Sequence, residues 1–112
     1  MSYSVGKMAE ELMLDPSDVK EIFEAFFEDA YPLIKDGTAA LQAGDRHLLS
    51  RKMHALKGSA LNLRMDELGN LASQAEKNET LSENELLGLM AKIQAGLEAV
   101  EASVNAFYRD AQ

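Results

Sequence analysis

Seven apolar residues in the C-terminal third of the chain repeat at alternating spacings of four and three. They are Leu86, Met90, Ile93, Leu97, Val100, Val104 and Phe107. Side chains at these spacings fall on one side of an α-helix, because successive residues turn by about 100° around its axis. Ser82 and Glu85 have the spacing of a capping box, which marks a helix start. The pattern therefore predicts a helix from Glu83 to about Arg109 that buries one long stripe.

A second long helix is predicted from Pro16 to about Ala43. Asp15 offers a capping side chain, Pro16 suits the first helical position, and Gly44 suits the position after the end. The residues expected on the buried side are Val19, Ile22, Phe23, Phe26, Ala30, Leu33 and Leu41. Pro32 removes one hydrogen bond from the helix interior, so we expect a bend there.

Three shorter helices are predicted over residues 4 to 14, 46 to 63 and 66 to about 78. Asp45 and Asp66 are expected to cap the second and third of these. The connections are short, which favours antiparallel neighbours. We therefore predict an all-α fold, an antiparallel four-helix bundle with a short additional N-terminal helix as a lid. Residues 1–112 are expected to form one domain. A long coiled coil is disfavoured, because the heptad pattern fails outside the last helix.

Composition excludes several classes of protein. The chain has no cysteine, which removes disulfides, thiolate nucleophiles and cysteine metal sites. No apolar run approaches the ~20 residues of a membrane span, and the first residues lack the apolar region typical of a signal peptide, so we expect a cytoplasmic protein without membrane contact. A net charge of −8 opposes binding to nucleic acid. The glycines lack the spacing of a nucleotide-binding loop.

His54 is the candidate for chemistry. Five apolar residues define the buried stripe of its helix, namely Leu49, Met53, Leu56, Ala60 and Leu63. His54 lies roughly 140° from the centre of that stripe and is expected to face solvent. Lys57 and Gly58 follow one turn later on the same side. A glycine inside a helix costs about 1 kcal/mol relative to alanine, and nothing inside the fold calls for one here, so Gly58 points to a functional surface.

The run from His54 to Ala60, His-x-Leu-Lys-Gly-Ser-Ala, is followed by Asn62-Leu63 and a short amphipathic helix. This arrangement resembles the histidine-containing phosphotransfer (HPt) domains of two-component phosphorelays. The resemblance implies that His54 accepts a phosphoryl group from a receiver aspartate and passes it to another, with no ATP-binding or kinase activity in this chain. Arg64 departs from the family pattern, in which glycine commonly follows the Asn-Leu pair.

The resemblance also implies roles for neighbouring residues. Lys57 would offset the negative charge of the phosphoryl oxygens. A residue on the following helix would orient the imidazole of His54. Counting along the family motif leads to Glu76 as this residue, with Gln74 as the alternative. It is equally open whether Glu76 orients the imidazole or is simply a solvated surface charge. The expected docking residues are Gly58, Arg51, Ala55 and His47.

The partners implied by the family are receiver domains of response regulators and a hybrid sensor kinase, and we expect a monomer. Mg²⁺ is expected on the receiver, with no cofactor in this chain. A zinc site is excluded, because His47 and His54 lie about 10 Å apart along the helix and no cysteine is available. The alternative function is a helical adaptor that docks a receiver or kinase without accepting phosphate.

Overall fold

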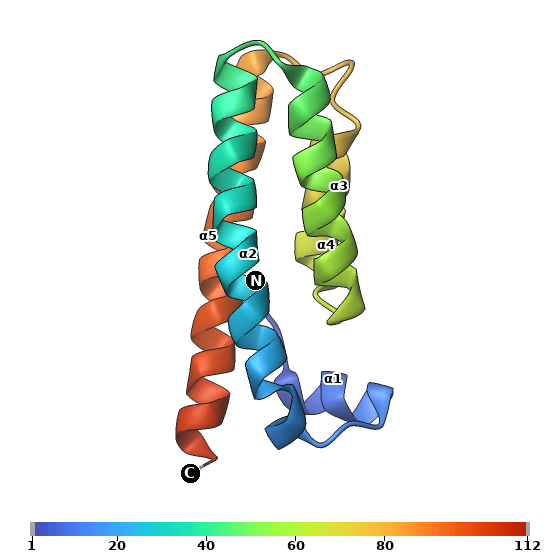
Figure 1. Cartoon of the computed structure of the whole chain (residues 1–112), viewed down its shortest axis with the longest axis vertical. Helices are drawn as coiled ribbons and strands as arrows, with labels where there is room; N and C mark the ends of the chain where they lie inside the picture. Colours follow the sequence, from blue (N-terminus) through green and yellow to red (C-terminus); the bar gives the residue numbers. More distant parts are fainter. Residues whose placement is uncertain (1, 112) are drawn as a thin grey trace.

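The computed structural model describes residues 2–111, and within that range the chain forms helices and no strand. The helices are α1 (Val5–Leu12), α2 (Pro16–Gln42), α3 (Arg46–Asn62), α4 (Asp66–Glu76) and α5 (Glu83–Asp110) (Figure 1). The predicted all-α class is confirmed. Each predicted helix is present, with ends within two residues of those expected.

Side chains at the helix starts explain where three helices begin. The Asp15 carboxylate accepts a hydrogen bond from the backbone N–H two residues later, at 3.0 Å. The Asp45 carboxylate does the same three residues later, also at 3.0 Å. Ser82 and Glu85 form the predicted capping box, in which each side chain bonds the backbone N–H of the other. These bonds satisfy N–H groups that have no partner within the helix.

The start of α4 differs from the prediction. Asp66 is the first residue of the helix and not its cap, because Met65 holds the capping position and makes no side-chain capping bond. The Met65 side chain is buried, so packing holds this turn in place. Asp66 and Glu67 put negative charge at the positive end of the helix dipole, which stabilises α4 without a cap.

The predicted buried face of α2 is wrong at Ile22, which is 50% exposed. The stripe around it, including Val19, Phe23 and Phe26, is buried. On a helical projection Ile22 lies about 80° from the centre of that stripe, at its edge. Ala40 points in the same direction five turns later and is 4% exposed. Leu33, on the same edge, is half-buried. The pattern therefore identified the correct face of α2, whose edge is buried near the C-terminal end of the helix and exposed near its start.

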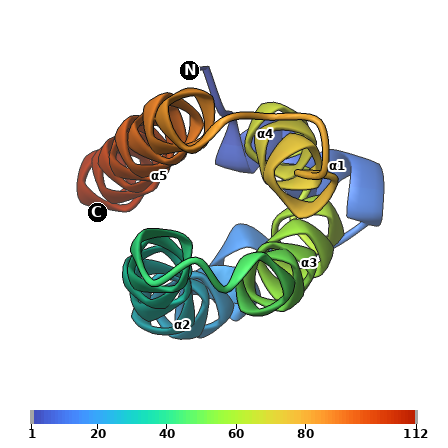
Figure 2. The ribbon, with the colours of Figure 1, turned by 90° about the horizontal axis from the view of Figure 1, so that it is seen from above.

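Successive long helices run in opposite directions, and α2, α3, α4 and α5 surround a common core (Figure 2). The described chain measures 46 × 21 × 20 Å. Its length matches that of α5, since 28 residues at ~1.5 Å each span about 42 Å. α3 and α4 form a shorter hairpin beside the α2 and α5 pair (Figure 1). This hairpin carries the candidate site.

α1 covers the lower end of the α3–α4 hairpin, in the position expected of a lid (Figure 1). Val5, Met8 and Ala9 are its buried residues. The Tyr3 hydroxyl donates a hydrogen bond to the Leu63 carbonyl at 2.7 Å, which ties the segment before α1 to the end of α3. Burial raises the pKa of Tyr3, so the phenol keeps the proton that it donates.

The core is a single cluster of apolar side chains contributed by all five helices. Its largest fully buried members are Phe23, Met8, Leu49, Met53, Leu56, Leu68, Leu86, Met90, Ile93, Leu97, Val19 and Val100. Among the described residues, no helix combines the length and the apolar character that a membrane span requires.

Candidate functional site

α3 turns one face to the core and holds His54 on the other. Leu49, Met53 and Leu56 are each 0% exposed. The His54 side chain is 70% exposed, about half-way along the helix. Because the apolar stripe fixes the rotation of α3, it also fixes the direction in which His54 leaves the bundle. His54 thus lies on the outer face that the spacing predicts.

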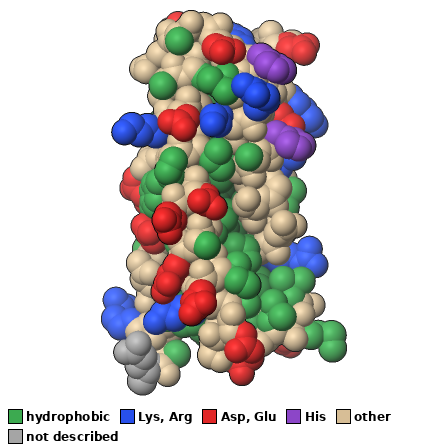
Figure 3. All heavy atoms as spheres, in the orientation of Figure 1, with side chains coloured by type: hydrophobic (Ala, Val, Ile, Leu, Met, Phe, Trp, Pro, Cys, Tyr) green, Lys and Arg blue, Asp and Glu red, His purple; other side chains and the backbone are tan. Residues whose placement is uncertain are grey.

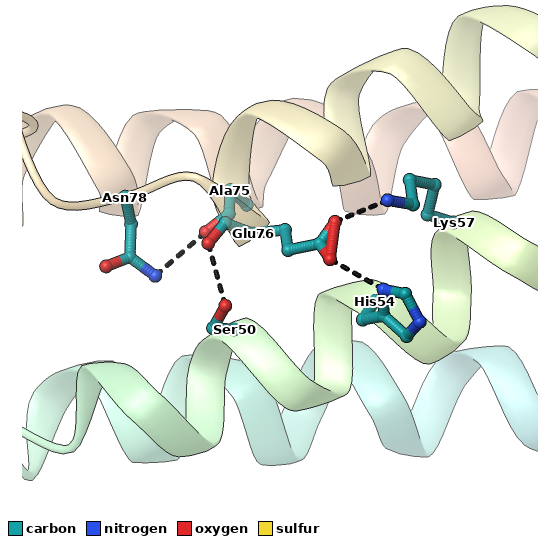
Figure 4. Close-up of polar contacts among 6 residues, drawn as sticks. All are labelled: Ser50, His54, Lys57, Ala75, Glu76 and Asn78. Atoms are coloured by element: carbon teal, nitrogen blue, oxygen red, sulfur yellow. Dashed lines mark hydrogen bonds and ion pairs between the residues drawn. The ribbon is translucent and has the colours of Figure 1, made fainter.

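α4 places a carboxylate against this histidine. Glu76 is the last residue of α4, and its Oε1 lies 2.6 Å from His54 Nδ1 (Figure 4). An ionised carboxylate can only accept hydrogen bonds, so the hydrogen in this contact belongs to Nδ1. In a neutral ring the second nitrogen, Nε2, then carries the free electron pair. Figure 4 shows that nitrogen turned away from Glu76.

Lys57 binds the other oxygen of the same carboxylate. Its Nζ donates to Glu76 Oε2 at 2.6 Å, so Glu76 bridges Lys57 and His54 (Figure 4). The Lys57 hydrogen bond is the main factor that lowers the pKa of Glu76, with a smaller contribution from the bond to His54, while partial burial acts in the opposite direction. Glu76 is therefore ionised at neutral pH and able to accept both bonds.

Gly58 lies one turn after His54 with open space around it. A Cβ built at Gly58 would meet nothing within 4 Å, and the residue is exposed within regular helix. No packing inside the described chain requires its small size. Ala55, Arg51 and His47 are also exposed on α3. The structure thus groups all four predicted docking residues with His54 on one helix.

Gln74, the alternative to Glu76, is exposed on α4 and forms no hydrogen bond with His54 in the described chain. It precedes Glu76 by two residues, which turns its side chain by about 200° around the helix axis. The two candidates therefore point in nearly opposite directions, and the structure brings only Glu76 to the histidine.

A family model described as Hpt domain matches residues 21–103, from the second turn of α2 to near the end of α5. The chain belongs to the histidine-containing phosphotransfer (HPt) family. The match includes His54, Lys57 and Glu76 and leaves α1 outside. Membership implies histidine-based phosphotransfer in two-component signalling. Comparison with curated proteins and with solved structures gave no match.

The HPt domain carries its charges unevenly. α3 contains four of the eleven Lys and Arg residues and none of the nineteen Asp and Glu residues. Figure 3 shows both His side chains on the upper part of the visible face with Lys and Arg side chains close to them, and Asp and Glu side chains both there and lower down. Among the helices of the described chain, His54 therefore lies on the one that carries basic residues and no acidic residue.

Not all of these cations face solvent freely. The Arg46 guanidinium donates to the backbone carbonyls of Asn78 and Leu81, and Lys52 lies 3.9 Å from Asp36. Arg51 is exposed one turn before His54 and is the α3 cation best placed to meet a partner.

Asn78 and Ser50 are polar residues of the site that sequence reasoning missed. Asn78 is only 4% exposed, and its Nδ2 donates to the Ala75 carbonyl at 3.0 Å. The Ser50 hydroxyl donates to the Glu76 carbonyl at 2.8 Å (Figure 4). Asparagine just after a helix end is a recognised C-terminal signal, and it was the one available clue.

Within residues 2–111, no three His, Cys, Asp or Glu side chains form a group that could hold a metal ion. His47 and His54 are both on α3, and only His54 contacts a carboxylate among the described residues. That contact distinguishes the two exposed histidines of this HPt domain.

Proposed function

We propose that this HPt domain is a phosphorelay intermediate, in which His54 takes a phosphoryl group from the aspartyl phosphate of one receiver and passes it to the aspartate of another. One observation carries the proposal. Glu76 lies 2.6 Å from His54 Nδ1 while the imidazole is 70% exposed. A ring held at one nitrogen and open at the other is suited to nucleophilic attack.

The electron pair on Nε2 attacks phosphorus and forms an N–P bond. The P–O bond of the acyl phosphate breaks, and its electron pair leaves with the aspartate carboxylate. As Nε2 donates, positive charge develops on the ring, and the Glu76 carboxylate beside Nδ1–H stabilises it. The reverse reaction delivers the group to a second aspartate, so no nucleotide is consumed.

Lys57 would neutralise charge on the transferring group. Its ammonium carries three hydrogens, of which the bond to Glu76 uses one. The others remain to meet phosphoryl oxygens above His54, one turn away. Mg²⁺ would be held by the receiver carboxylates and offset further charge in the transition state. No cofactor of this chain takes part in the proposal.

The receiver would approach the exposed face of α3. Gly58 and Ala55 present little side chain there, which lets the rim of the receiver site come close to the helix. Arg51 and His47 add hydrogen-bond donors at the edge of the same face. The domain would act as a cytoplasmic monomer and not as an autonomous enzyme, with a hybrid sensor kinase supplying the first phosphorylated receiver.

Phosphoryl transfer from a phosphorylated receiver domain tests the proposal. The wild-type domain is expected to acquire an acid-labile, base-stable label, as a phosphoramidate bond requires. His54→Gln is expected to acquire none. His47→Gln is the matched control for the site of labelling, since this histidine is exposed on the same helix without a carboxylate partner. It should still acquire the acid-labile label, even if a change at the docking face slows the reaction.

Label retained in His54→Gln would exclude His54 as the acceptor. If the wild type binds the receiver with no label on any histidine, the domain is instead a docking adaptor. A binding measurement on the same samples, with unphosphorylated receiver, separates the two functions.

A further inference from the structure

Asn78 is the single polar or charged residue in the buried class among the described residues, and it lies just beyond α4. Its Nδ2 donates to the Ala75 carbonyl at 3.0 Å and to the Arg46 carbonyl at 3.3 Å. A buried amide that lost these partners would cost about 1–3 kcal/mol. The bonds therefore fix Asn78 against both helices of the hairpin.

Arg46 completes this link from the other side. Its guanidinium donates to the Asn78 carbonyl at 2.8 Å and to the Leu81 carbonyl. Arg46 and Asn78 thus bind each other through side chain and backbone in both directions. The connection from α4 to α5 is held against the first turn of α3 as a result.

Ser50 makes the bond nearest to the histidine. Its hydroxyl donates at 2.8 Å to the carbonyl of Glu76, the residue whose side chain contacts His54 (Figure 4). Ser50 also lies on α3, four residues before His54, and so on the same side of the helix. One residue of α4 is therefore bound to successive turns of α3, at its backbone and at its carboxylate.

Helix ends need such bonds, because the last four carbonyls of a helix have no partner within it. In α4, Asn78 satisfies Ala75 and Ser50 satisfies Glu76. Without them the last turn of α4 is the part most prone to fray. Fraying there would move Glu76, whose long side chain already has several rotatable bonds.

We propose that Arg46, Ser50 and Asn78 form a positioning clamp, which holds the end of α4 so that the Glu76 carboxylate keeps His54 in its Nδ1–H tautomer. These residues do not touch the reacting atoms. The inference rests on the proposed role of His54 and extends it, because orienting groups must be held within about 0.5 Å to be effective. On this proposal, the tautomer of His54 depends on how the α3–α4 hairpin is held together and not on Glu76 alone.

The ring nitrogen chemical shifts of His54 test the clamp directly. At alkaline pH, where imidazole is neutral, ¹⁵N NMR distinguishes Nδ1–H from Nε2–H. Wild-type His54 is expected to show the Nδ1–H pattern. In Ser50→Ala and Asn78→Ala its shifts should move toward the Nε2–H pattern that an unrestrained histidine side chain favours in water. His47 serves as an internal control on the same helix and should not change.

Ser50→Thr is the conservative variant, since it keeps a hydroxyl that can reach the Glu76 carbonyl. It should retain the wild-type His54 shifts. Altered shifts in Ser50→Ala together with unaltered shifts in Ser50→Thr would not result from a loss of stability alone. Thermal unfolding followed by circular dichroism identifies any variant that fails to fold, and Ser50→Ala, at a half-buried site, keeps the test available if Asn78→Ala does not fold.

Phosphoryl transfer gives the second readout. Both alanine variants should accept the group from a phosphorylated receiver about tenfold more slowly, the lower end of the range for groups that orient a histidine. Unchanged His54 shifts in the folded Ser50→Ala variant would overturn the clamp. If wild-type His54 acquires no label, the proposed function fails, and the NMR comparison still decides on the clamp.

Discussion

His54 Nδ1 lies 2.6 Å from Glu76 Oε1, although 22 positions separate the two residues in the chain. The α3–α4 turn reverses the chain between them, so the distance depends on the packing of the two helices. The same carboxylate binds Lys57 at 2.6 Å. Three polar side chains thus form one connected unit around a ring that is otherwise open to solvent, and each can be altered separately.

Glu76→Ala is expected to slow phosphoryl transfer by about 10- to 100-fold, by analogy with the loss of a partner that orients a metal-bound histidine. Receiver affinity should change little, because the docking residues lie on α3. Gln74→Ala is the matched control, since Gln74 is exposed on the same helix without a bond to His54. Transfer rates and receiver binding are measured on the same proteins. An unaffected rate in Glu76→Ala would show that the Glu76 carboxylate does not orient the imidazole during transfer.

Lys57→Met is expected to raise the pKa of Glu76 toward its ordinary value of 4.5, because the Lys57 hydrogen bond is the largest cause of its depression. A carboxyl whose pKa is lower in the folded state than in the unfolded state stabilises the protein at any pH above the unfolded-state pKa. This stabilisation is lost as the pH falls through the folded-state pKa. Lys57→Met should therefore lose less stability on acidification than wild type.

The Glu76 carboxyl carbon, followed by NMR from pH 7 to pH 2, measures this shift. Lys52→Met is the control, since Lys52 lies 3.9 Å from Asp36 and does not bind Glu76. A Glu76 titration that is the same in Lys57→Met and wild type would show that the ion pair is not formed in solution.

The sequence predicted the helices and the outward direction of His54 because both depend on local pattern. Apolar spacing sets the rotation of each helix, and capping residues such as Asp45 and Ser82 set its start. Local pattern could not decide between Glu76 and Gln74, because the answer depends on how far α4 is rotated about its axis relative to α3. That rotation follows from burial of residues such as Ala72 and Ala75, which is a tertiary property.

The clamp could not be read from the sequence for a related reason. Arg46 looks like a surface cation until Asn78, 32 positions later, is brought against it. Ser50 looks like a solvated helix residue until the end of α4 packs beside it. Ile22 shows the opposite error, because spacing alone cannot tell which turns of a helix a neighbouring element covers. Pairings over such distances are decided by the packed hairpin.

Gly58→Gln is expected to weaken receiver binding about tenfold, or ~1.4 kcal/mol, without loss of fold stability. The added side chain would enter solvent, since nothing lies within 4 Å of its Cβ position, and it would obstruct the receiver instead. The helix propensity of glutamine is also more favourable than that of glycine by roughly 0.5–1 kcal/mol. Chemical unfolding and receiver titration measure the two effects; unchanged affinity and transfer would exclude Gly58 from the interface.

Gly69→Ala is the contrasting glycine on the same hairpin, and it should destabilise the fold relative to Gly58→Ala by about 1 kcal/mol, the lower end for overpacking, because the Leu61 side chain that must move is 36% exposed. A Cβ at Gly69 would lie 2.8 Å from Leu61 Cγ, too close for contact, so Leu61 would have to leave its place against α4. Both substitutions replace glycine with alanine inside a helix and so gain the same helix propensity. The two variants therefore differ in stability only through the space available to the new Cβ. Urea unfolding of the two variants gives the comparison, and equal stabilities would contradict it.

Arg64→Gly is expected to be more stable than Arg64→Ala by about 1 kcal/mol. Arg64 has a φ of +60° in the turn between α3 and α4. A left-handed conformation costs a residue with a Cβ roughly 1–2 kcal/mol, and glycine adopts it freely but loses more entropy on folding. Both variants lose the exposed contact of Arg64 with Glu11 at 4.0 Å, which is worth little, so their difference isolates the backbone. Urea unfolding of the two proteins measures it, and an alanine variant as stable as the glycine one would mean that this turn adopts another conformation in solution.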